Sequence, residues 1–392
     1  MIKRNIAKKL TELSKQYPIV SLTGPRQSGK TTLVKTVFPD WSYVSLEEPD
    51  IREFALTDPR GFIEAYPKHT IIDEVQRAPD LFSYIQTHVD HIGKPEVYVL
   101  TGSFNFGLME GISQSLAGRV AVLELLPFSF SELNQADILP DTIEKVMFTG
   151  SYPRIYDMNL DPSEWYSNYV TTYLERDVRQ VKNITDLSTF QRFLKMCASR
   201  SGQILNLSAL GNDCGITHNT AKSWLSILQA GYIIYLLKPH YKNFNKRLIK
   251  SSKLYFFDSG LLSYLLNISS AEALNTHASR GNIFETWIVS ELLKARTNKG
   301  LKENLYFWRD NTGHEIDCII DKGDKLLPLE IKSGKTVAKD FFNGLNYYAL
   351  ISKDAHIEPT LVYAGLSDQP RKEANILSWK SFGNRVDDII LT

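Results

Sequence analysis

The segment Gly24-Pro-Arg-Gln-Ser-Gly-Lys-Thr-Thr32 fits the pattern G-x-x-x-x-G-K-[ST] without departure. It follows an apolar run, 19–23, that predicts a short buried strand, and it leads into a segment, 31–37, that can begin a helix. Such a loop presents backbone N–H groups to a phosphate at a helix N-terminus. Lys30 would reach the β- and γ-phosphates, and the Thr31 hydroxyl would ligate Mg²⁺. The segment therefore predicts a site for ATP and Mg²⁺, with nucleotide contacts from Gly24, Pro25, Arg26, Gln27, Ser28, Gly29, Lys30, Thr31 and Thr32.

The composition is that of a soluble globular protein. The 392 residues are enough for two or three domains, and 43% are hydrophobic and 23% charged. Lys+Arg 45 against Asp+Glu 44 leaves no overall field for nucleic acid or membrane, so any such contact must come from a local patch. Three separated cysteines without metal-ligand spacing indicate a reducing cytoplasm. No apolar run is long enough to span a membrane, so we expect a cytoplasmic protein without a membrane partner.

The N-terminal segment 1–16 predicts an amphipathic helix that packs on the first strand, and a basic helix at a membrane surface is the alternative. Its apolar face would carry Ile2, Ile6, Leu10 and Leu13. The basic residues would lie outside that face, and they are Lys3, Arg4, Lys8 and Lys9.

Two acidic residues end a second apolar strand, 69–72, about 40 residues after the loop. Asp73 would hold the Mg²⁺ shell, and Glu74 would orient or deprotonate the attacking water. A third strand, 96–101, runs into a turn with polar side chains. Ser103, or Asn105 as second choice, would lie between Glu74 and the γ-phosphate as a sensor. A simple Gly-Ser turn is the alternative.

Arg119 ends a predicted helix just before the strand 120–125. An arginine there can be presented to the γ-phosphate of a neighbouring subunit, which would require a homo-oligomer. The alternative is a salt-bridged arginine at a helix end.

Several motifs together resemble a prokaryotic AAA+-type P-loop ATPase family that couples the ATPase to a C-terminal domain of unknown function. Besides the P-loop, the motifs are Leu46–Phe54, Asp58–Phe62, Ile71–Gln76, Leu100–Ser103, Leu116–Val120, Leu125–Leu133 and Gly150–Pro153. Family members usually show Gly-Gly in the last motif, and Ser151 departs from that. The resemblance covers nearly the whole chain and implies a parallel sheet of the ASCE type, with Glu74 as the catalytic acid.

The middle of the chain predicts helices and a winged helix. Aromatic residues at 3–4 spacing in 155–200 indicate core packing, and Arg176 or Arg154 could be a second phosphate sensor or part of an internal ion pair. Segments 205–217 and 218–229 read as helix, turn, helix, with Thr217 as N-cap and with Ala221, Leu225 and Leu228 on the buried face. The strand 231–237 would supply the wing.

The loop from Lys238 to Lys253 carries six Lys and Arg residues, no acid, and two aromatic residues. Basic residues interleaved with aromatics are typical of a nucleic-acid contact. We therefore expect DNA to bind through the winged helix and this loop. Winged helices in this class of ATPase also serve as lids or spacers, which is the alternative.

The last third is similar to the PD-(D/E)xK nuclease pattern, in which a helix glutamate and an aspartate precede E-x-K. The matching residues are Glu285, Asp317, Glu330 and Lys332. Glu330 and Lys332 share one face of a strand because the strand period is two, and a hairpin would bring Asp317 alongside. Asp317 and Glu330 could then bind Mg²⁺, and Lys332 could hold the attacking water. A nuclease-like fold without activity is the alternative.

The sequence thus predicts an α/β protein of three domains. These are an AAA+-type P-loop ATPase (1–154), a helical lid with a winged helix (155–240) and a restriction-endonuclease-like domain (241–392). The leading hypothesis is a Mg²⁺-dependent ATPase that acts on DNA, with the C-terminal domain gated by ATP. One rival is an ATP-dependent switch or scaffold that binds a protein partner through an inactive nuclease-like domain. A third is an ATP-gated regulator that binds DNA without cutting it.

Overall fold

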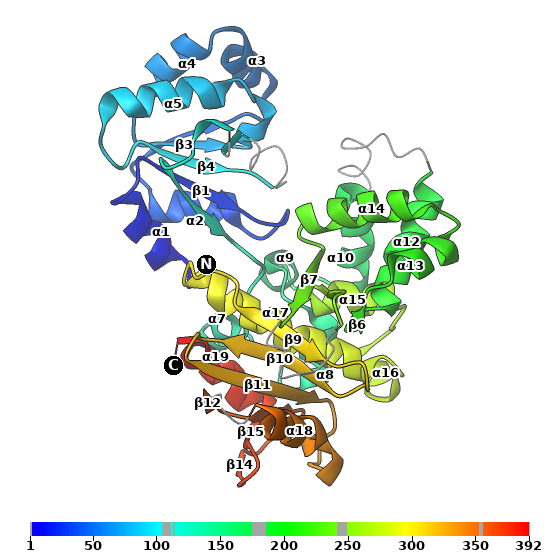
Figure 1. The fold of residues 1–392 in the computed structure, drawn as a ribbon. Helices are drawn as coiled ribbons and strands as arrows, with labels where there is room; N and C mark the ends of the chain where they lie inside the picture. The colour runs from blue at the N-terminus through cyan, green and yellow to red at the C-terminus, as the bar shows by residue number, and fades with distance from the viewer. Residues whose placement is uncertain are drawn as a thin grey trace. The chain divides into compact units, whose positions relative to one another are not determined.

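The computed structural model of this chain describes residues 2–103, 111–112, 114–174, 186–240, 249–352 and 356–391. These residues form two compact units (Figure 1). The first unit comprises Met1–Phe128 and Thr297–Leu301, and the second comprises Ser129–Arg296 and Lys302–Thr392. Each unit has its own sheet and its own hydrophobic clusters.

The first unit is built on a parallel sheet whose described strands run in the order β2-β3-β4-β1-β5. The strands are β1 (Ile19–Thr23), β2 (Ser42–Ser45), β3 (Thr70–Asp73), β4 (Tyr98–Thr101) and β5 (Val120–Glu124). Because all pairings are parallel, the carboxyl ends of β1, β3 and β4 meet at one edge of the sheet. The predicted α/β fold with a parallel sheet is confirmed for this unit.

Helices cover both faces of this sheet (Figure 1). They are α1 (Ala7–Ser14), α2 (Lys30–Val37), α3 (Pro49–Thr57), α4 (Pro59–Ala65) and α5 (Leu81–Ile92). Neighbouring strand residues point to opposite faces, so Val20 joins the cluster that contains Leu33 of α2. Ile19 joins the other cluster, which contains Phe62 of α4. Burial on both faces explains why the strands read as continuous apolar runs.

The second unit combines helices with a mixed sheet. Its helices are α7 (Phe130–Gln135), α8 (Ile143–Thr149), α9 (Pro153–Asp157), α10 (Pro162–Tyr169), α12 (Leu187–Ser199), α13 (Leu207–Cys214), α14 (His218–Ala230), α15 (Ser259–Leu265), α16 (Ala271–Thr276), α17 (Arg280–Asn298), α18 (Asn343–Ile351) and α19 (Trp379–Leu391). A π-helical turn, Val170–Leu174, follows α10 directly. Trp308 and Ile316 of the sheet pack with Leu345 and Tyr348 of α18 in one buried cluster.

The described strands of the second unit form one continuous sheet in the order β14-β15-β13-β11-β10-β9-β7-β8-β6, with β12 paired to β11. They are β6 (Gln203–Ile204), β7 (Ile234–Pro239), β8 (Lys253–Phe256), β9 (Leu305–Arg309), β10 (Glu315–Asp321), β11 (Lys325–Lys332), β12 (His356–Ile357), β13 (Thr360–Tyr363), β14 (Gln369–Pro370) and β15 (Asn375–Ser378). β7 pairs antiparallel with β8 and parallel with β9. The strands that follow the helix-turn-helix segment therefore share a sheet with the C-terminal strands.

The two compact units do not coincide with the three domains expected from the sequence, and the domain boundaries stay predictions. The expected boundary at 154 falls in α9, within the second unit, and the boundary at 240 falls between the paired strands β7 and β8. The reason is that β7 uses one edge for β8 and the other for β9. No helix in the described part of the chain is both long and apolar enough to cross a membrane.

Candidate functional site

The P-loop of the first unit follows β1 and leads into α2. Gly24 has a φ of 143°, and a Cβ there would lie 2.2 Å from the carbonyl oxygen of Leu125, so only glycine fits. Gly29, with a φ of 90°, is the N-cap of α2 and supplies no side-chain cap. The first N–H groups of α2 therefore have no partner within the helix. The predicted nucleotide contacts, residues 24–32, lie in this loop and the first turn of α2.

Lys30 is folded back on the loop. Its ammonium donates to the carbonyl oxygens of Gly24 at 2.9 Å and Pro25 at 2.8 Å, and its side chain is buried. The loop therefore already holds this positive charge close to the backbone that would surround a phosphate.

Arg4 holds the P-loop in place, a role that the sequence analysis missed. Its Nη1 donates to the carbonyl oxygen of Ser28 at 2.7 Å, and its Nη2 donates to that of Leu126 at 2.6 Å. The guanidinium also lies 4.9 Å from the ring centre of Phe128. The prediction that Arg4 lies outside the buried face is wrong, because α1 begins only at Ala7 and its periodicity does not extend to residue 4.

The carboxylate of Asp73 accepts hydrogen bonds from three hydroxyl groups. Oδ2 accepts from the hydroxyls of Thr31 at 2.9 Å and Tyr43 at 2.7 Å. Oδ1 accepts from the hydroxyl of Thr101 and from the N–H of Glu74 at 3.2 Å. The contact between Asp73 and Thr31 brings the two predicted metal ligands of the first unit together.

Tyr43 is a member of this site that the sequence analysis missed. Burial and the hydrogen bond to the Asp73 carboxylate raise the pKa of Tyr43 well above its ordinary value, so the phenol remains a donor. The pairing of β2 with β3 could have pointed to Tyr43. Ser45 pairs with Asp73 and Tyr43 lies two residues earlier, so Tyr43 is on the same face of β2.

Glu74 is held by two uncharged donors. Ser103 Oγ donates to Oε1 at 2.9 Å, and Gln76 Nε2 donates to Oε2. Glu74 also has a left-handed backbone with a φ of 54°, a conformation that is rare outside glycine and concentrates at functional sites. The contact of Ser103 with Glu74 is the one expected for a sensor, and Gln76 was not assigned a role. Asn105 lies outside the described residues.

Arg119 lies at the start of β5 and pairs with Asp90 of α5. Its Nε and Nη2 donate to the two carboxylate oxygens at 2.5 and 2.8 Å, and the guanidinium lowers the pKa of Asp90. The carbonyl oxygen of Arg119 accepts from Ile19 at the beginning of β1, whereas the P-loop follows the other end of that strand. Arg119 is thus at the opposite edge of the sheet from the P-loop of its own chain. Its role as a finger in a neighbouring subunit stays a prediction.

The proposed second phosphate sensors also stay predictions. Arg154 is exposed in α9 of the second unit. Arg176 lies outside the described residues.

The turn before α9 is as sharp as the family motif implies. Gly150 has a φ of 69° and a ψ of −154°, a region that other residues rarely adopt. A Cβ at Gly150 would lie 2.1 Å from the hydroxyl of Tyr166 and 2.5 Å from Oδ1 of Asp258. The backbone therefore approaches these side chains too closely for any residue except glycine.

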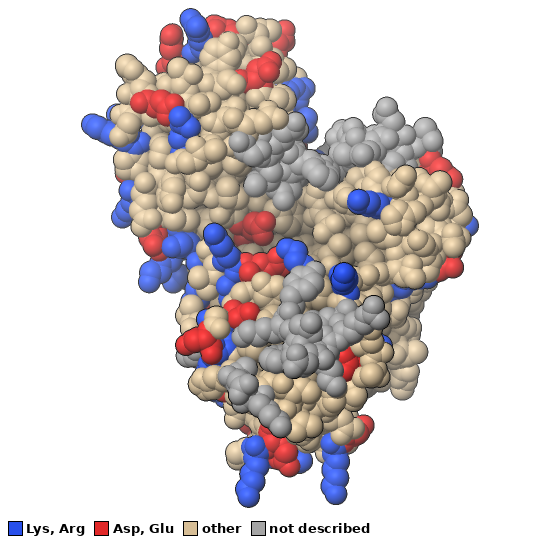
Figure 2. Space-filling view, in the orientation of Figure 1, with Lys and Arg blue, Asp and Glu red and all other residues tan. Residues whose placement is uncertain are grey.

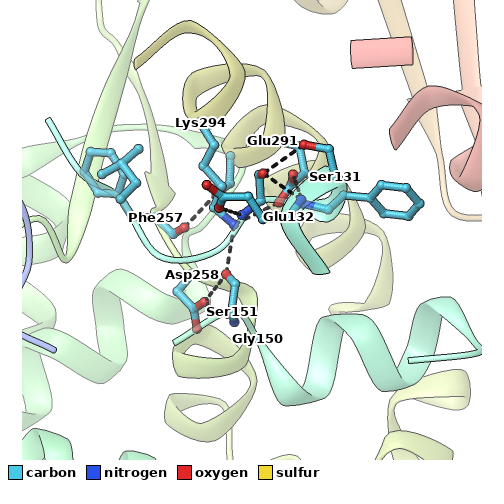
Figure 3. Close-up of polar contacts among 12 residues, drawn as sticks. Ser131, Glu132, Gly150, Ser151, Phe257, Asp258, Glu291 and Lys294 are labelled. Carbon is cyan, nitrogen blue, oxygen red and sulfur yellow. Dashed lines mark hydrogen bonds and ion pairs between the residues drawn. The ribbon is translucent and has the colours of Figure 1, made fainter. Parts of the chain in front are cut away.

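Ser151, which stands where the family usually has a second glycine, uses its side chain in a buried network (Figure 3). Its N–H and its hydroxyl both donate to Oδ2 of Asp258 at 2.8 Å. Lys294 donates to Ser151 Oγ and to Oε1 of Glu291, each at 2.8 Å. Glu291 accepts in turn from the N–H of Phe130 at 2.7 Å. The network joins α7, the turn before α9, the start of α15 and α17, and the sequence assigned no role to its side chains.

The helix-turn-helix segment has the expected local structure. α13 ends at Cys214 with Gly215 as its C-cap, whose φ is 69°. The Thr217 hydroxyl caps α14 by accepting from the N–H of Thr220 at 3.1 Å. Ala221, Leu225 and Leu228 are buried as predicted. β7 and β8 follow as an antiparallel pair. The assignment of these elements as a winged helix that binds DNA stays a prediction.

The basic loop is described only in part. Residues 241–248, which include Lys242, Lys246 and Arg247, lie outside the described residues. Lys250 is exposed, and Lys238 lies 3.6 Å from the carboxylate of Glu303. Lys253 is buried, so the prediction that it belongs to an exposed basic footprint is wrong. On the face drawn in Figure 2, Lys and Arg are interspersed with Asp and Glu.

The four residues of the nuclease-like pattern come together in the second unit. Lys332 Nζ donates to Glu330 Oε1 at 2.5 Å, and Oδ2 of Asp317 accepts from the N–H of Ile331 at 2.8 Å. The fourth residue, Glu285 of α17, is joined to Asp317 through Lys253. The ammonium of Lys253 lies 3.1 Å from Glu285 Oε1 and 3.9 Å from Asp317 Oδ1.

The carboxylates of this group are perturbed by burial. Burial raises the pKa of Glu285 to about 7, with Lys253 opposing the shift and Asp317 adding to it. Burial, and next the negative charge of Asp317, raise the pKa of Glu330 to about 8. Two opposing effects act on the pKa of Lys253. Burial acts to lower its pKa, but the neighbouring carboxylates outweigh burial, and the pKa lies above the ordinary value for lysine.

The predicted metal site at Asp317 and Glu330 of the second unit stays a prediction. Within the described ranges, no group of three or more His, Cys, Asp or Glu side chains is arranged to hold a metal ion. Instead, Lys253 Nζ contacts the carboxylates of Glu285 and Glu315. A polar cavity of about 450 Å³ lies beside this group, and Lys253, Arg309, Asp310 and Glu315 are among its lining residues.

Three stretches of the chain match described families. Residues 16–134 match the family described as AAA domain, 140–272 match a domain of unknown function (DUF8612), and 280–382 match another domain of unknown function (DUF4143). The last two descriptions name no activity. They support neither the nuclease resemblance nor DNA binding.

The chain is also similar to proteins of known sequence and to solved structures. It is 31% identical over 340 residues to an uncharacterized protein of Mycobacterium tuberculosis and to one of Mycobacterium bovis, covering 85% of this chain and 74% of each relative. A Walker-type ATPase of Pyrococcus abyssi is similar at 16% identity and a TM-score of 0.46, covering 66% of this chain and 94% of that one. AMPPCP-bound DnaA from Aquifex aeolicus is similar at 14% identity and a TM-score of 0.29, covering 57% and 85%. The sequence identities and TM-scores of both structures are too low to support a conclusion about function.

The P-loop, Asp73 and Glu74 all lie in the stretch that matches the AAA domain. The first unit is therefore an AAA-type P-loop ATPase domain, and the chain belongs to the same family as the two mycobacterial proteins.

Proposed function

We propose that this protein binds and hydrolyses ATP at the carboxyl edge of the first sheet. The observation that carries the proposal is the pair of contacts that place two acids beside the P-loop. Asp73 accepts from Thr31 of the loop, and the neighbouring Glu74 is held by Ser103. A P-loop alone binds phosphate, but an oriented carboxylate next to it can also activate water.

The residues present fit ATP and Mg²⁺. The first turn of α2 has N–H groups without an intrahelical acceptor, which suits phosphate oxygens. Asp73 and Thr31 offer a carboxylate and a hydroxyl, the oxygen ligands that Mg²⁺ prefers. When bound, the ion would neutralise charge on the phosphates. Lys30 would exchange its bonds to Gly24 and Pro25 for phosphate oxygens.

Glu74 is the residue that we assign to the attacking water. Both of its carboxylate oxygens already accept hydrogen bonds, from Ser103 and Gln76, and its backbone is held in a left-handed conformation. A carboxylate fixed in this way loses little freedom when it orients a water molecule. Ser103 would act as the sensor, since its hydroxyl can exchange Glu74 for a γ-phosphate oxygen.

For the second unit we propose nucleic-acid binding through the helix-turn-helix segment and the basic loop. The supporting observations are the capped α14 helix, the β7–β8 pair that follows it, and exposed Lys250 in the same loop. Binding of this kind would couple ATP hydrolysis in the first unit to DNA.

A second candidate function is an ATP-dependent switch that binds a protein partner. One observation favours it. Lys253 of the basic loop is buried among carboxylates and so cannot contribute to the positive surface that a DNA-binding face needs.

The experiment that tests both proposals is ATP turnover of the full chain, with and without single-stranded, duplex and branched DNA. Turnover that requires Mg²⁺ and is lost in Lys30→Ala would support the ATPase. The exposed Lys15→Ala is the matched control. Stimulation by one DNA form, weakened by salt, would support DNA as the partner. Full turnover without stimulation by any DNA would favour the protein-partner switch, and turnover unchanged in Lys30→Ala would refute the ATPase site.

A further inference from the structure

The charge cluster of the second unit has a lysine where the nuclease-like pattern would have a metal ion. The cluster consists of Glu285 on α17, Glu315 and Asp317 on β10, Glu330 and Lys332 on β11, and Lys253 on β8. The lysine comes from a part of the chain that the pattern does not include. It reaches the cluster because β8, β7, β9, β10 and β11 are successive strands of one sheet.

Lys253 makes the contacts that a central cation would make. Its Nζ lies 3.1 Å from Oε1 of Glu285, is ion-paired with Oε1 of Glu315, and lies 3.9 Å from Oδ1 of Asp317. The Lys253 side chain is 3% exposed. A buried ammonium has three N–H groups to satisfy, and here three carboxylates surround it.

The other oxygens of Glu315 and Asp317 accept from further donors, and Glu285 Oε1 is shared between Lys253 and a second donor. Glu285 Oε1 also accepts from the hydroxyl of Tyr255 at 2.5 Å. Glu315 Oε2 accepts from Arg309 at 2.9 Å, and Asp317 Oδ2 accepts from the backbone N–H of Ile331 at 2.8 Å. A divalent ion needs several carboxylate or carbonyl oxygens that point at one place and are free to bind it. The carboxylate oxygens of this cluster do not offer that arrangement.

Glu330 is the carboxylate of this cluster whose hydrogen bonding is incomplete. Its Oε1 accepts from Lys332 at 2.5 Å, but its Oε2 is buried without a hydrogen-bond partner among the described residues. A Cβ on Gly344 of α18 would lie 3.1 Å from that oxygen, so the helix packs closely over it. Helix α18 therefore limits the space on that side of Oε2.

We infer that Lys253 is the resident cation of this cluster, and that the cluster is stabilised by the lysine and takes no divalent metal. Carboxylates gathered in a buried site repel one another unless a positive charge lies among them. Lys253 supplies this charge from within the chain. The second unit then lacks the metal-activated water that a PD-(D/E)xK nuclease requires, and Lys253 and Glu315 form part of the wall of the adjacent polar cavity.

The test uses the full chain carrying Asp73→Asn, so that the first unit lacks the carboxylate assigned to Mg²⁺, and Mn²⁺ as the probe. In this background we expect no stoichiometric Mn²⁺ binding by calorimetry and no change of Tm between EDTA and Mn²⁺. Adding Lys253→Met should lower the Tm in EDTA by roughly 5 °C or more, because the carboxylates lose their counter-charge. Mn²⁺ should then recover part of the loss. Lys250→Met, an exposed lysine in the same loop, is the matched control and should leave the Tm unchanged.

Two results would overturn the inference. One is Mn²⁺ binding in the background protein that Asp317→Asn removes, since the acids would then hold a metal beside Lys253. The other is a Lys253→Met protein whose Tm in EDTA equals that of the Lys250→Met control. If Lys253→Met does not fold, the calorimetric measurement on the background protein decides by itself.

Discussion

Replacing Arg4 by methionine should loosen the P-loop, although Arg4 lies outside both the P-loop and the strand that ends in Asp73. Methionine keeps most of the length of the side chain but removes the guanidinium. The carbonyl oxygens of Ser28 and Leu126 would then lose donors at 2.7 and 2.6 Å. Hydrogen bonds to a charged group contribute about 1.5–3 kcal/mol each, and they are not fully additive. We therefore expect a local loss of about 2–4 kcal/mol.

The assay is native-state hydrogen exchange of the amides in β1 and α2, with binding of a fluorescent ATP analogue measured in parallel. A loss of that size would speed exchange roughly 30- to 700-fold, since each factor of ten corresponds to about 1.4 kcal/mol. ATP affinity should fall as well, because the loop must be reordered on binding. Lys3→Met, the exposed neighbour, is the matched control. Exchange and affinity in Arg4→Met equal to those of the control would refute the role assigned to Arg4.

Four further outcomes can be checked. Glu74→Gln should keep ATP binding while turnover drops by about 10²–10⁴-fold, the scale for loss of a positioned base; undiminished turnover would contradict the assignment. If Arg119 acts in trans, Arg119→Ala should bind ATP without hydrolysing it. Mixing this variant with Glu74→Gln should then restore some turnover. Full activity of a strictly monomeric wild type would exclude a role in trans. Gly150→Ala should destabilise the second unit by roughly 2 kcal/mol or more in urea unfolding, whereas Gly313→Ala, with a φ of 96° but nothing within 4 Å of its Cβ, should lose much less. Finally, the pKa of Glu330 is raised to about 8, so the native state retains a proton that the unfolded chain releases near its ordinary pKa, and stability should fall as pH rises from about 5 to 8. Glu330→Gln should flatten this dependence of Tm on pH. An unchanged slope in the variant would contradict the prediction.

Features that depend on neighbouring residues in the chain could be predicted from the sequence. The P-loop is one of them, because its glycines and the helix start after them are local requirements of the backbone. The N-cap at Thr217 and the buried face of α14 are others, since capping and helical period involve residues three or four apart. The placement of Ser103 beside Glu74 was also predictable, because parallel strands end at the same edge of a sheet.

Other features depended on contacts between distant parts of the chain. Arg4 bonds to a carbonyl 122 residues away, and Ser151 bonds to Asp258, 107 residues away. Periodicity indicates which face of an element a side chain takes, but it does not indicate which other elements meet that face. The boundaries of the units have the same origin, because β7 pairs with both β8 and β9.

Lys253 shows most clearly what only the tertiary structure decided. In the sequence it ends a basic loop and predicts an exposed phosphate contact. In the structure it is buried, with Glu285 and Glu315 in contact with its ammonium. The composition of a segment determines its charge, but whether the charge faces solvent or an acid depends on which strands join the sheet. A lysine among carboxylates can replace a metal ion as counter-charge, and no pattern of spacing in the sequence distinguishes the two.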